Sequence, residues 1–150
     1  MKICICSSMT FYKQFSEFKK ELEKMGHTVL APEIEFETKG DDTSVGAFFD
    51  SHGGVDAFPP DHEVWKKKGR AILTHFQKID ESHCVLITNY EKKGVPDYIG
   101  ANGFLEMGYA YAKGKPIYIL NNLPKQSAFK EEILGMQPIV LHGDVSKISM

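Results

Sequence analysis

The sequence predicts an α/β fold, in which a five-stranded parallel sheet carries helices on both faces. Short apolar runs rich in β-branched residues alternate with longer segments whose apolar residues recur at helical spacing. This alternation is typical of strand–helix–strand units, whose strands pair in parallel. The runs predicted as strands are residues 2–7, 28–31, 84–88, 116–120 and 138–141.

Five strands in this order favour the flavodoxin-like (Rossmann-like) arrangement, a three-layer sandwich with strand order 2-1-3-4-5. In such sheets a ligand lies beyond the carboxyl ends of the strands, at the switch point between strands one and three. The loops expected at that point are residues 7–10 and 89–102. With 150 residues the chain is expected to form one domain, residues 1–150, with a core of ordinary size.

Four segments are predicted as the main helices. The first follows the turn at residues 7–10, and a glycine ends it. Its apolar stripe consists of Phe11, Phe15, Phe18, Leu22 and Met25. The second covers residues 61–81, with Asp61 as its N-cap, and the third covers 102–113, with Asn102 as its N-cap. The fourth, shorter helix is expected at residues 125–134.

Residues 32–60 break the alternation of strands and helices. The segment is rich in acids and glycines and is too long for an ordinary connection, which predicts either a lid or a mobile insertion. Part of it has an apolar surface to bury, to which Phe48, Phe49 and Phe58 belong.

The composition excludes several classes of protein. The formal net charge is −2 and the chain has a single arginine, Arg70, so no basic surface for a nucleic-acid polymer is expected. The adjacent lysines 66–68 are interpreted as a solvated helix face. No run reaches the length of a membrane span and the chain starts directly in a strand, so we expect neither membrane association nor a signal peptide, and a cytoplasmic location.

The three cysteines are interpreted as small buried apolar residues. Cys4 and Cys6 alternate along a strand and are not a Cys-x-x-Cys pair. His52 and His62 flank the insertion without further ligands at fixed spacing. The sequence therefore predicts no metal site and no cofactor.

One carboxylate stands out in the third predicted helix. Glu106 lies among apolar residues, and no cation within a turn explains it as a helical ion pair. With Asn102 as N-cap it would be the fourth helical residue, where the helix dipole favours the ionised form while apolar packing favours the neutral one. A carboxylate poised in this way suits a covalent nucleophile for sugar transfer. The alternative is a first-turn glutamate that faces solvent.

The run Gly103-Phe104-Leu105-Glu106-Met107-Gly108-Tyr109-Ala110, followed by Gly114-Lys115-Pro116, resembles the nucleoside 2-deoxyribosyltransferase superfamily, which includes deoxynucleoside and deoxynucleotide N-glycoside hydrolases. The resemblance is specific only over residues 100–116. It implies that Glu106 attacks the anomeric carbon of the sugar. It also implies a homodimer or larger homo-oligomer, in which a neighbour completes the pocket.

Further site residues are expected around Glu106. The turn at Ser7, Ser8 and Met9 could hold a phosphate or a sugar hydroxyl, or serve only to cap the helix, and Tyr12 could stack on a base. His75 stands where the family usually carries an aspartate that orients the ribose or the leaving base, although a lone helix histidine is often structural. The remaining candidates lie in the loop before Glu106 and are Asn89, Asp97, Tyr98, Gly100 and Asn102.

Gly100 departs from the family pattern, because transferases of the family often carry a base-contacting aspartate six residues before the nucleophile. Either Asp97 or Asn102 takes over that contact, or base recognition differs. We therefore expect cleavage or transfer at the N-glycosidic bond of a (deoxy)nucleoside or its 5′-monophosphate, a small-molecule partner. The alternative is a non-catalytic nucleotide-binding or sensing module on the same fold.

Overall fold

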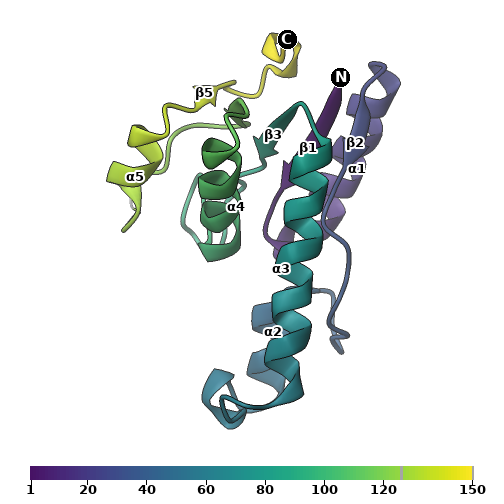
Figure 1. Ribbon diagram of the computed structural model, residues 1–150, viewed down its shortest axis with the longest axis vertical. Helices are drawn as coiled ribbons and strands as arrows, with labels where there is room; N and C mark the ends of the chain where they lie inside the picture. The colour runs from purple at the N-terminus through teal and green to yellow at the C-terminus, as the bar shows by residue number, and fades with distance from the viewer. Residues whose placement is uncertain (126, 150) are drawn as a thin grey trace.

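The computed structural model describes residues 1–125 and 127–149, and it contains one five-stranded parallel sheet of order β2-β1-β3-β4-β5 (Figure 1). The strands are β1 (Lys2–Cys6), β2 (Thr28–Leu30), β3 (Cys84–Ile87), β4 (Ile117–Ile119) and β5 (Ile139–Val140). The α/β, flavodoxin-like fold predicted from the sequence is confirmed. Each strand is shorter than the run from which it was predicted.

The helices form two layers on the sheet. The helix α1 (Tyr12–Lys24), preceded by the short η1 (Met9–Phe11), covers one face together with the C-terminal η3 (Val145–Lys147). The helices α3 (Glu63–Glu81), α4 (Ala101–Ala112) and α5 (Lys130–Gly135) cover the other face. Because side chains alternate along β1, Ile3 and Ile5 pack under α1, whereas Cys4 and Cys6 face α3 and α4.

The predicted helix ends were wrong at three places. The N-cap of α4 is Gly100 and not Asn102, and a β-carbon at Gly100 would lie 3.1 Å from the Tyr98 ring, so a glycine fits that position. The N-cap of α3 is His62 and not Asp61, since His62 Nδ1 accepts a hydrogen bond from Val64 N at 3.1 Å. The last helix, expected over 125–134, begins only at Lys130, and Gln126 lies outside the described residues.

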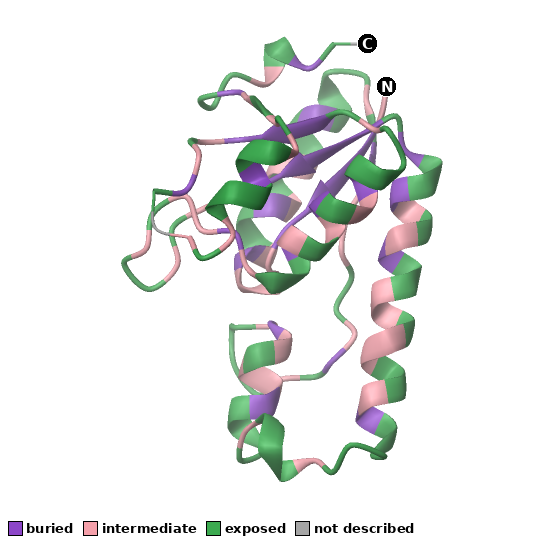
Figure 2. Ribbon diagram, turned by 60° about the vertical axis from the view of Figure 1, so that its left-hand side comes forward, coloured by how far each residue is buried: buried purple, intermediate pink, exposed green. Residues whose placement is uncertain are grey.

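The segment 32–60 contains the helix α2 (Val45–Ser51) and the short η2 (Val55–Ala57). Its aromatic side chains bury one another against the N-terminal half of α3, where the Phe49 and Trp65 rings stack 5.1 Å apart. Figure 2 shows this part beside the lower half of α3, away from the strands. The segment thus has a small apolar cluster of its own, and its mobility remains a prediction.

None of the helices within residues 1–125 and 127–149 combines the length and the apolarity that crossing a bilayer requires.

Candidate active site

A cavity of about 70 Å³ lies beside the carboxyl end of β1, at the predicted switch point. Four parts of the chain line it: the turn after β1, the start of the 32–60 segment, the middle of α3 and the first turns of α4. Residues far apart in sequence therefore meet here only because strands one and three are neighbours. Polar side chains that line the cavity include those of Ser7, Lys68, His75, Asn102 and Glu106.

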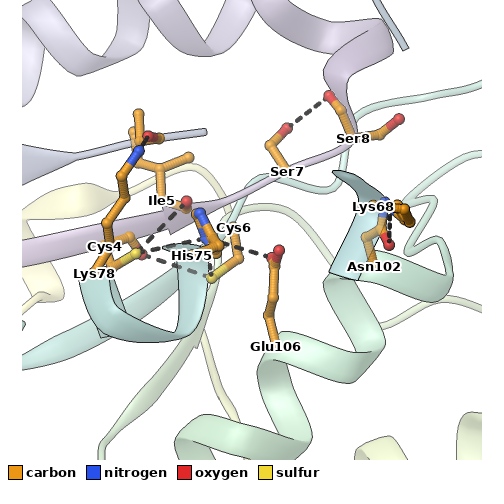
Figure 3. A network of polar contacts seen from close by, with 11 residues as sticks. Cys4, Ile5, Cys6, Ser7, Ser8, Lys68, His75, Lys78, Asn102 and Glu106 are labelled. Carbon is orange, nitrogen blue, oxygen red and sulfur yellow. Dashed lines mark hydrogen bonds and ion pairs between the residues drawn. The ribbon is translucent and has the colours of Figure 1, made fainter. Parts of the chain in front are cut away.

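Glu106 projects from α4 toward β1 (Figure 3). Its side chain is only 12% exposed, and within the described residues its buried Oε2 atom has no hydrogen-bond partner. Burial raises the pKa of this carboxyl group to about 7, although the charge of His75 works in the opposite direction. Because α4 begins at Ala101, Glu106 is the sixth helical residue rather than the fourth. The helix dipole expected to favour its ionised form is therefore weak there.

His75 faces Glu106 from α3. The Nε2 atom of His75 lies 3.6 Å from Glu106 Oε2, and the imidazole is 8% exposed. Burial lowers the pKa of His75, but the contact with Cys4 and the charge of Glu106 outweigh it, so that the pKa is raised overall. Because the charge of each group affects the other, Glu106 and His75 titrate as a coupled pair.

Cys4 and Cys6 complete the cluster from β1. Each Sγ atom lies 3.6 Å from His75 Nε2, and both thiols are fully buried. The contact with Cys6 and the neighbouring His75 lower the pKa of Cys4 to about 6 against the effect of burial, whereas burial raises the pKa of Cys6. The sequence analysis treated these cysteines as plain apolar residues, and it missed their contact with His75, which lies 71 residues from Cys4.

Lys68 is a second residue that the sequence analysis missed. Lys66 and Lys67 are exposed as predicted, but Lys68 is half-buried, and its Nζ donates to Asn102 Oδ1 at 3.0 Å. Burial lowers the pKa of Lys68, while the negative charge of Glu106 acts against that shift. The spacing in the sequence could have indicated this position, because Lys68 precedes His75 by seven residues. Seven residues are two helical turns, so both side chains lie on the same face of the helix.

The structure separates the other predicted site residues into two groups. Ser7, Met9 and Asn102 line the cavity with Glu106 and His75. Ser8 instead caps η1, since its Oγ accepts from Thr10 N at 3.4 Å. The residues not among those lining this cavity are Tyr12, Asn89, Asp97, Tyr98 and Gly100.

Those residues have structural contacts of their own. The Tyr12 ring packs edge-on against Phe15. Asn89 is buried and joins two loops, because its Nδ2 donates to Asn122 O at 2.7 Å and its Oδ1 accepts from Asn121 N at 2.9 Å. Asp97 Oδ1 accepts from Asn122 N at 3.2 Å. Their roles in substrate binding remain predictions.

No protein-family model and no curated protein matches the chain. Eight solved chains are similar to it, among them the following three. A 2-deoxyribosyltransferase from Bacillus psychrosaccharolyticus is 18% identical over 79% of this chain and 71% of its own, with a TM-score of 0.45. The CMP N-glycosidase of Clostridium botulinum is 13% identical over 93% of this chain and 85% of its own, with a TM-score of 0.49.

The third is a flavoenzyme NAD(P)H:(acceptor) oxidoreductase from Paracoccus denitrificans, 14% identical over 99% of this chain and 75% of its own, with a TM-score of 0.48. Because identities and TM-scores are this low, the function of this chain has to be argued from its own residues.

Proposed function

We propose that the chain is an enzyme that cleaves or transfers at the N-glycosidic bond of a (deoxy)nucleoside or nucleoside 5′-monophosphate, with Glu106 as nucleophile. The observation that carries the proposal is the buried Glu106 carboxylate, whose Oε2 has no hydrogen-bond partner among the described residues and which lines a cavity at the switch point. The similarity of residues 100–116 to the superfamily motif supports the same assignment.

A structural role explains this carboxylate poorly. Leaving a buried polar group unpaired costs about 1–3 kcal/mol, and more when the group is charged. A residue that only supported α4 could be replaced by an apolar one at no loss. The cost of burying this carboxyl group is consistent with function, because a carboxyl group with a pKa of about 7 is partly ionised at neutral pH and little solvated.

In the proposed reaction the ionised carboxylate of Glu106 attacks the anomeric carbon. The N-glycosidic bond breaks, the base leaves with the bonding electron pair, and water protonates it. The product is a glycosyl ester of Glu106, which water or a second base then opens from the vacated face. His75 lies 3.6 Å away and acts on Glu106, because an imidazolium stabilises the ionised carboxylate and fixes its orientation.

The size of the cavity bears on how a substrate enters. Ligand pockets usually measure about 300–1,000 Å³, whereas this cavity measures about 70 Å³. The cavity is therefore smaller than the pockets that usually hold a ligand of nucleoside size. The 32–60 segment forms one wall, so we propose that it moves as a lid when substrate binds. The homodimer or larger assembly remains a prediction, for which sedimentation of the protein is the check.

The test is release of base from a panel of nucleosides and 5′-monophosphates, with and without an acceptor base. We expect the wild-type protein to release base from at least one substrate, and Glu106→Gln to lose about 10⁴-fold or more in rate. The matched control is Glu33→Gln, which removes a carboxylate at the same cavity whose side chain is exposed and paired with Lys78.

Activity of Glu106→Gln within about tenfold of wild type would remove Glu106 from the nucleophile role. Tight binding of a nucleotide without any base release would instead favour the non-catalytic module. The acceptor decides between the two reactions, since a transferase forms a new nucleoside only when a second base is present.

A further inference from the structure

Three side chains that could bind a metal meet beneath the cavity next to Glu106, and two of them have no part in the proposed reaction. Cys4 and Cys6 come from β1, and His75 comes from α3. Their ligand atoms all lie within 4.8 Å of one another, and Figure 3 shows them converging with Glu106. Two thiols, an imidazole and a carboxylate are the donor types that bind zinc in proteins.

The separations match a tetrahedral coordination shell. Zinc–sulfur bonds of about 2.3 Å and zinc–nitrogen bonds of about 2.0–2.1 Å, at tetrahedral angles, place sulfur and nitrogen about 3.6 Å apart. Cys4 Sγ and Cys6 Sγ each lie 3.6 Å from His75 Nε2. The corresponding separation between nitrogen and a carboxylate oxygen is about 3.4 Å, and Glu106 Oε2 lies 3.6 Å from His75 Nε2. Three donors therefore surround one position, and Glu106 lies next to them, where a rotation of its side chain would bring the carboxylate in as the fourth ligand.

Hydrogen bonding alone does not account for the cluster. His75 Nε2 faces two thiols and a carboxylate oxygen at the same distance. One ring nitrogen carries either one proton or one lone pair, so it satisfies one of these three neighbours. Within the described residues Glu106 Oε2 also has no hydrogen-bond partner, and its contact with His75 Nε2 is an ion pair at 3.6 Å. A single cation between the four donors would satisfy all of them together.

We propose that Cys4, Cys6 and His75 bind a zinc ion and that Glu106 rotates in as the fourth ligand, which closes a tetrahedral site and withholds Glu106 from the sugar. Two thiolates and an imidazole select a borderline-soft ion and disfavour Mg²⁺ and Ca²⁺. Binding releases to solvent the proton that Cys6 still carries, because thiolate is the ligand form and the pKa of Cys4 is already lowered. All four positions are taken by protein, so no site is left for a zinc-bound water.

The inhibitory half of this proposal rests on the proposed function, whereas metal binding does not. An ion reaches the cluster through the cavity, which both His75 and Glu106 line, while the cysteines behind them are fully buried. A glutamate bound to zinc cannot attack the anomeric carbon. The same site thus exists in two forms, a reactive metal-free form and a blocked zinc form.

The test titrates metal-free, reduced protein with Zn²⁺ against a chromophoric chelator, and with Co²⁺ to observe the ligands by absorption. We expect one ion per chain, a Kd of about 1 μM or tighter, and a tetrahedral cobalt spectrum with thiolate charge-transfer bands. Cys4→Ala/Cys6→Ala should weaken binding by about 100-fold or more. The matched control is Cys84→Ala, since Cys84 is equally buried but lies on the opposite face of the sheet.

The single variants Cys4→Ser and Cys6→Ser are measured as well, because they preserve side-chain volume if the double variant does not fold. Each should weaken Zn²⁺ binding and reduce the thiolate bands. Unchanged binding in the cysteine variants, equal weakening in Cys84→Ala, or no binding by the folded wild-type protein would overturn the site.

Base release is then measured with and without Zn²⁺. We expect zinc to inhibit the wild-type protein and the Cys84→Ala control, and to have little effect on the cysteine variants that no longer bind it. Zinc binding without inhibition would overturn the blocking role. Absence of base release from every substrate contradicts the proposed function alone, and the titrations still decide the metal site.

Discussion

The two faces of β1 differ in chemistry although they belong to the same five residues. On one face Ile3 and Ile5 lie in an apolar cluster under α1. On the other face Cys4 and Cys6 lie in an apolar layer that is interrupted at one point, by His75 and Glu106. Alternate side chains of a strand point to opposite faces, so one strand can contribute to an apolar core on one side and to a polar cluster on the other.

An apolar face stabilises the fold without restricting which atoms react. A face with thiols, an imidazole and a carboxylate contributes less to stability, because each polar group loses water on burial. On the face covered by α3 and α4, the polar cluster of Cys4, Cys6, His75 and Glu106 lies beneath the cavity. We therefore expect substitutions on the α1 face to change mainly the free energy of unfolding, and those at the cluster to change mainly chemistry.

The largest expected effect tests the α1 face. Phe15 is 1% exposed and packs between α1 and the sheet, so Phe15→Ala should lower the free energy of unfolding by about 3–5 kcal/mol. The measurement is urea denaturation. Base release per folded molecule should be retained. A loss of activity in the folded fraction would contradict the prediction that substitutions on the α1 face change mainly stability.

The next effect is a gain in stability at the cluster. The folded-state pKa of Glu106 is raised from 4.5 to about 7. Between these values the unfolded chain releases a proton that the folded protein keeps, so stability falls as pH rises from 4.5 to 7 and stays lower above 7. The groups that face this carboxyl are His75 and Lys68 from α3, and Cys4 and Cys6 from β1.

In metal-free protein Glu106→Gln should therefore be more stable than the wild type at pH 8 by about 1–3 kcal/mol, with no such gain at pH 4.5. The lost attraction to His75 keeps the gain below the full effect of the pKa difference. Thermal unfolding at several pH values is the measurement. If the stability difference between Glu106→Gln and the wild type were smaller at pH 8 than at pH 4.5, burial could not be the cause of the raised pKa of Glu106.

A smaller effect is expected for the cation at the cavity. Lys68→Met should weaken substrate binding by about 1–2 kcal/mol, roughly 5–30-fold, because a charged hydrogen-bond donor is lost. The loss should be larger for a 5′-monophosphate than for the matching nucleoside. The control is Lys66→Met, whose ammonium pairs with Glu63 on the surface. Equal losses in both variants would place Lys68 outside the binding site.

The smallest effect concerns the contact between the 32–60 segment and the turn after β1. Thr43 Oγ1 donates to Met9 O at 3.1 Å and joins the 32–60 segment to the turn after β1. Thr43→Val should raise the rate of proteolysis in the segment about fivefold, the equivalent of about 1 kcal/mol, and leave the sheet protected. Bound substrate should slow that cleavage. Identical protease resistance of segment and sheet would count against a lid.

The predicted fold was correct in strand order and in the placement of helices, for reasons that are local. The period of apolar residues is set by hydrogen bonding within an element, so the stripe of α1 and the apolar runs of β1 and β3 are visible in sequence. The site could also be anticipated in part. Glu106 is unusual among its own neighbours, and the topology places the loops after strands one and three together.

Long-range contacts were decided by the tertiary structure. Lys68 donates to Asn102, which lies 34 residues away in the sequence. Likewise, Cys4 and Cys6 look like core residues until α3 brings His75 over β1. Packing between elements distant in sequence selects these contacts, and hydrophobic periodicity carries no record of which polar side chains meet.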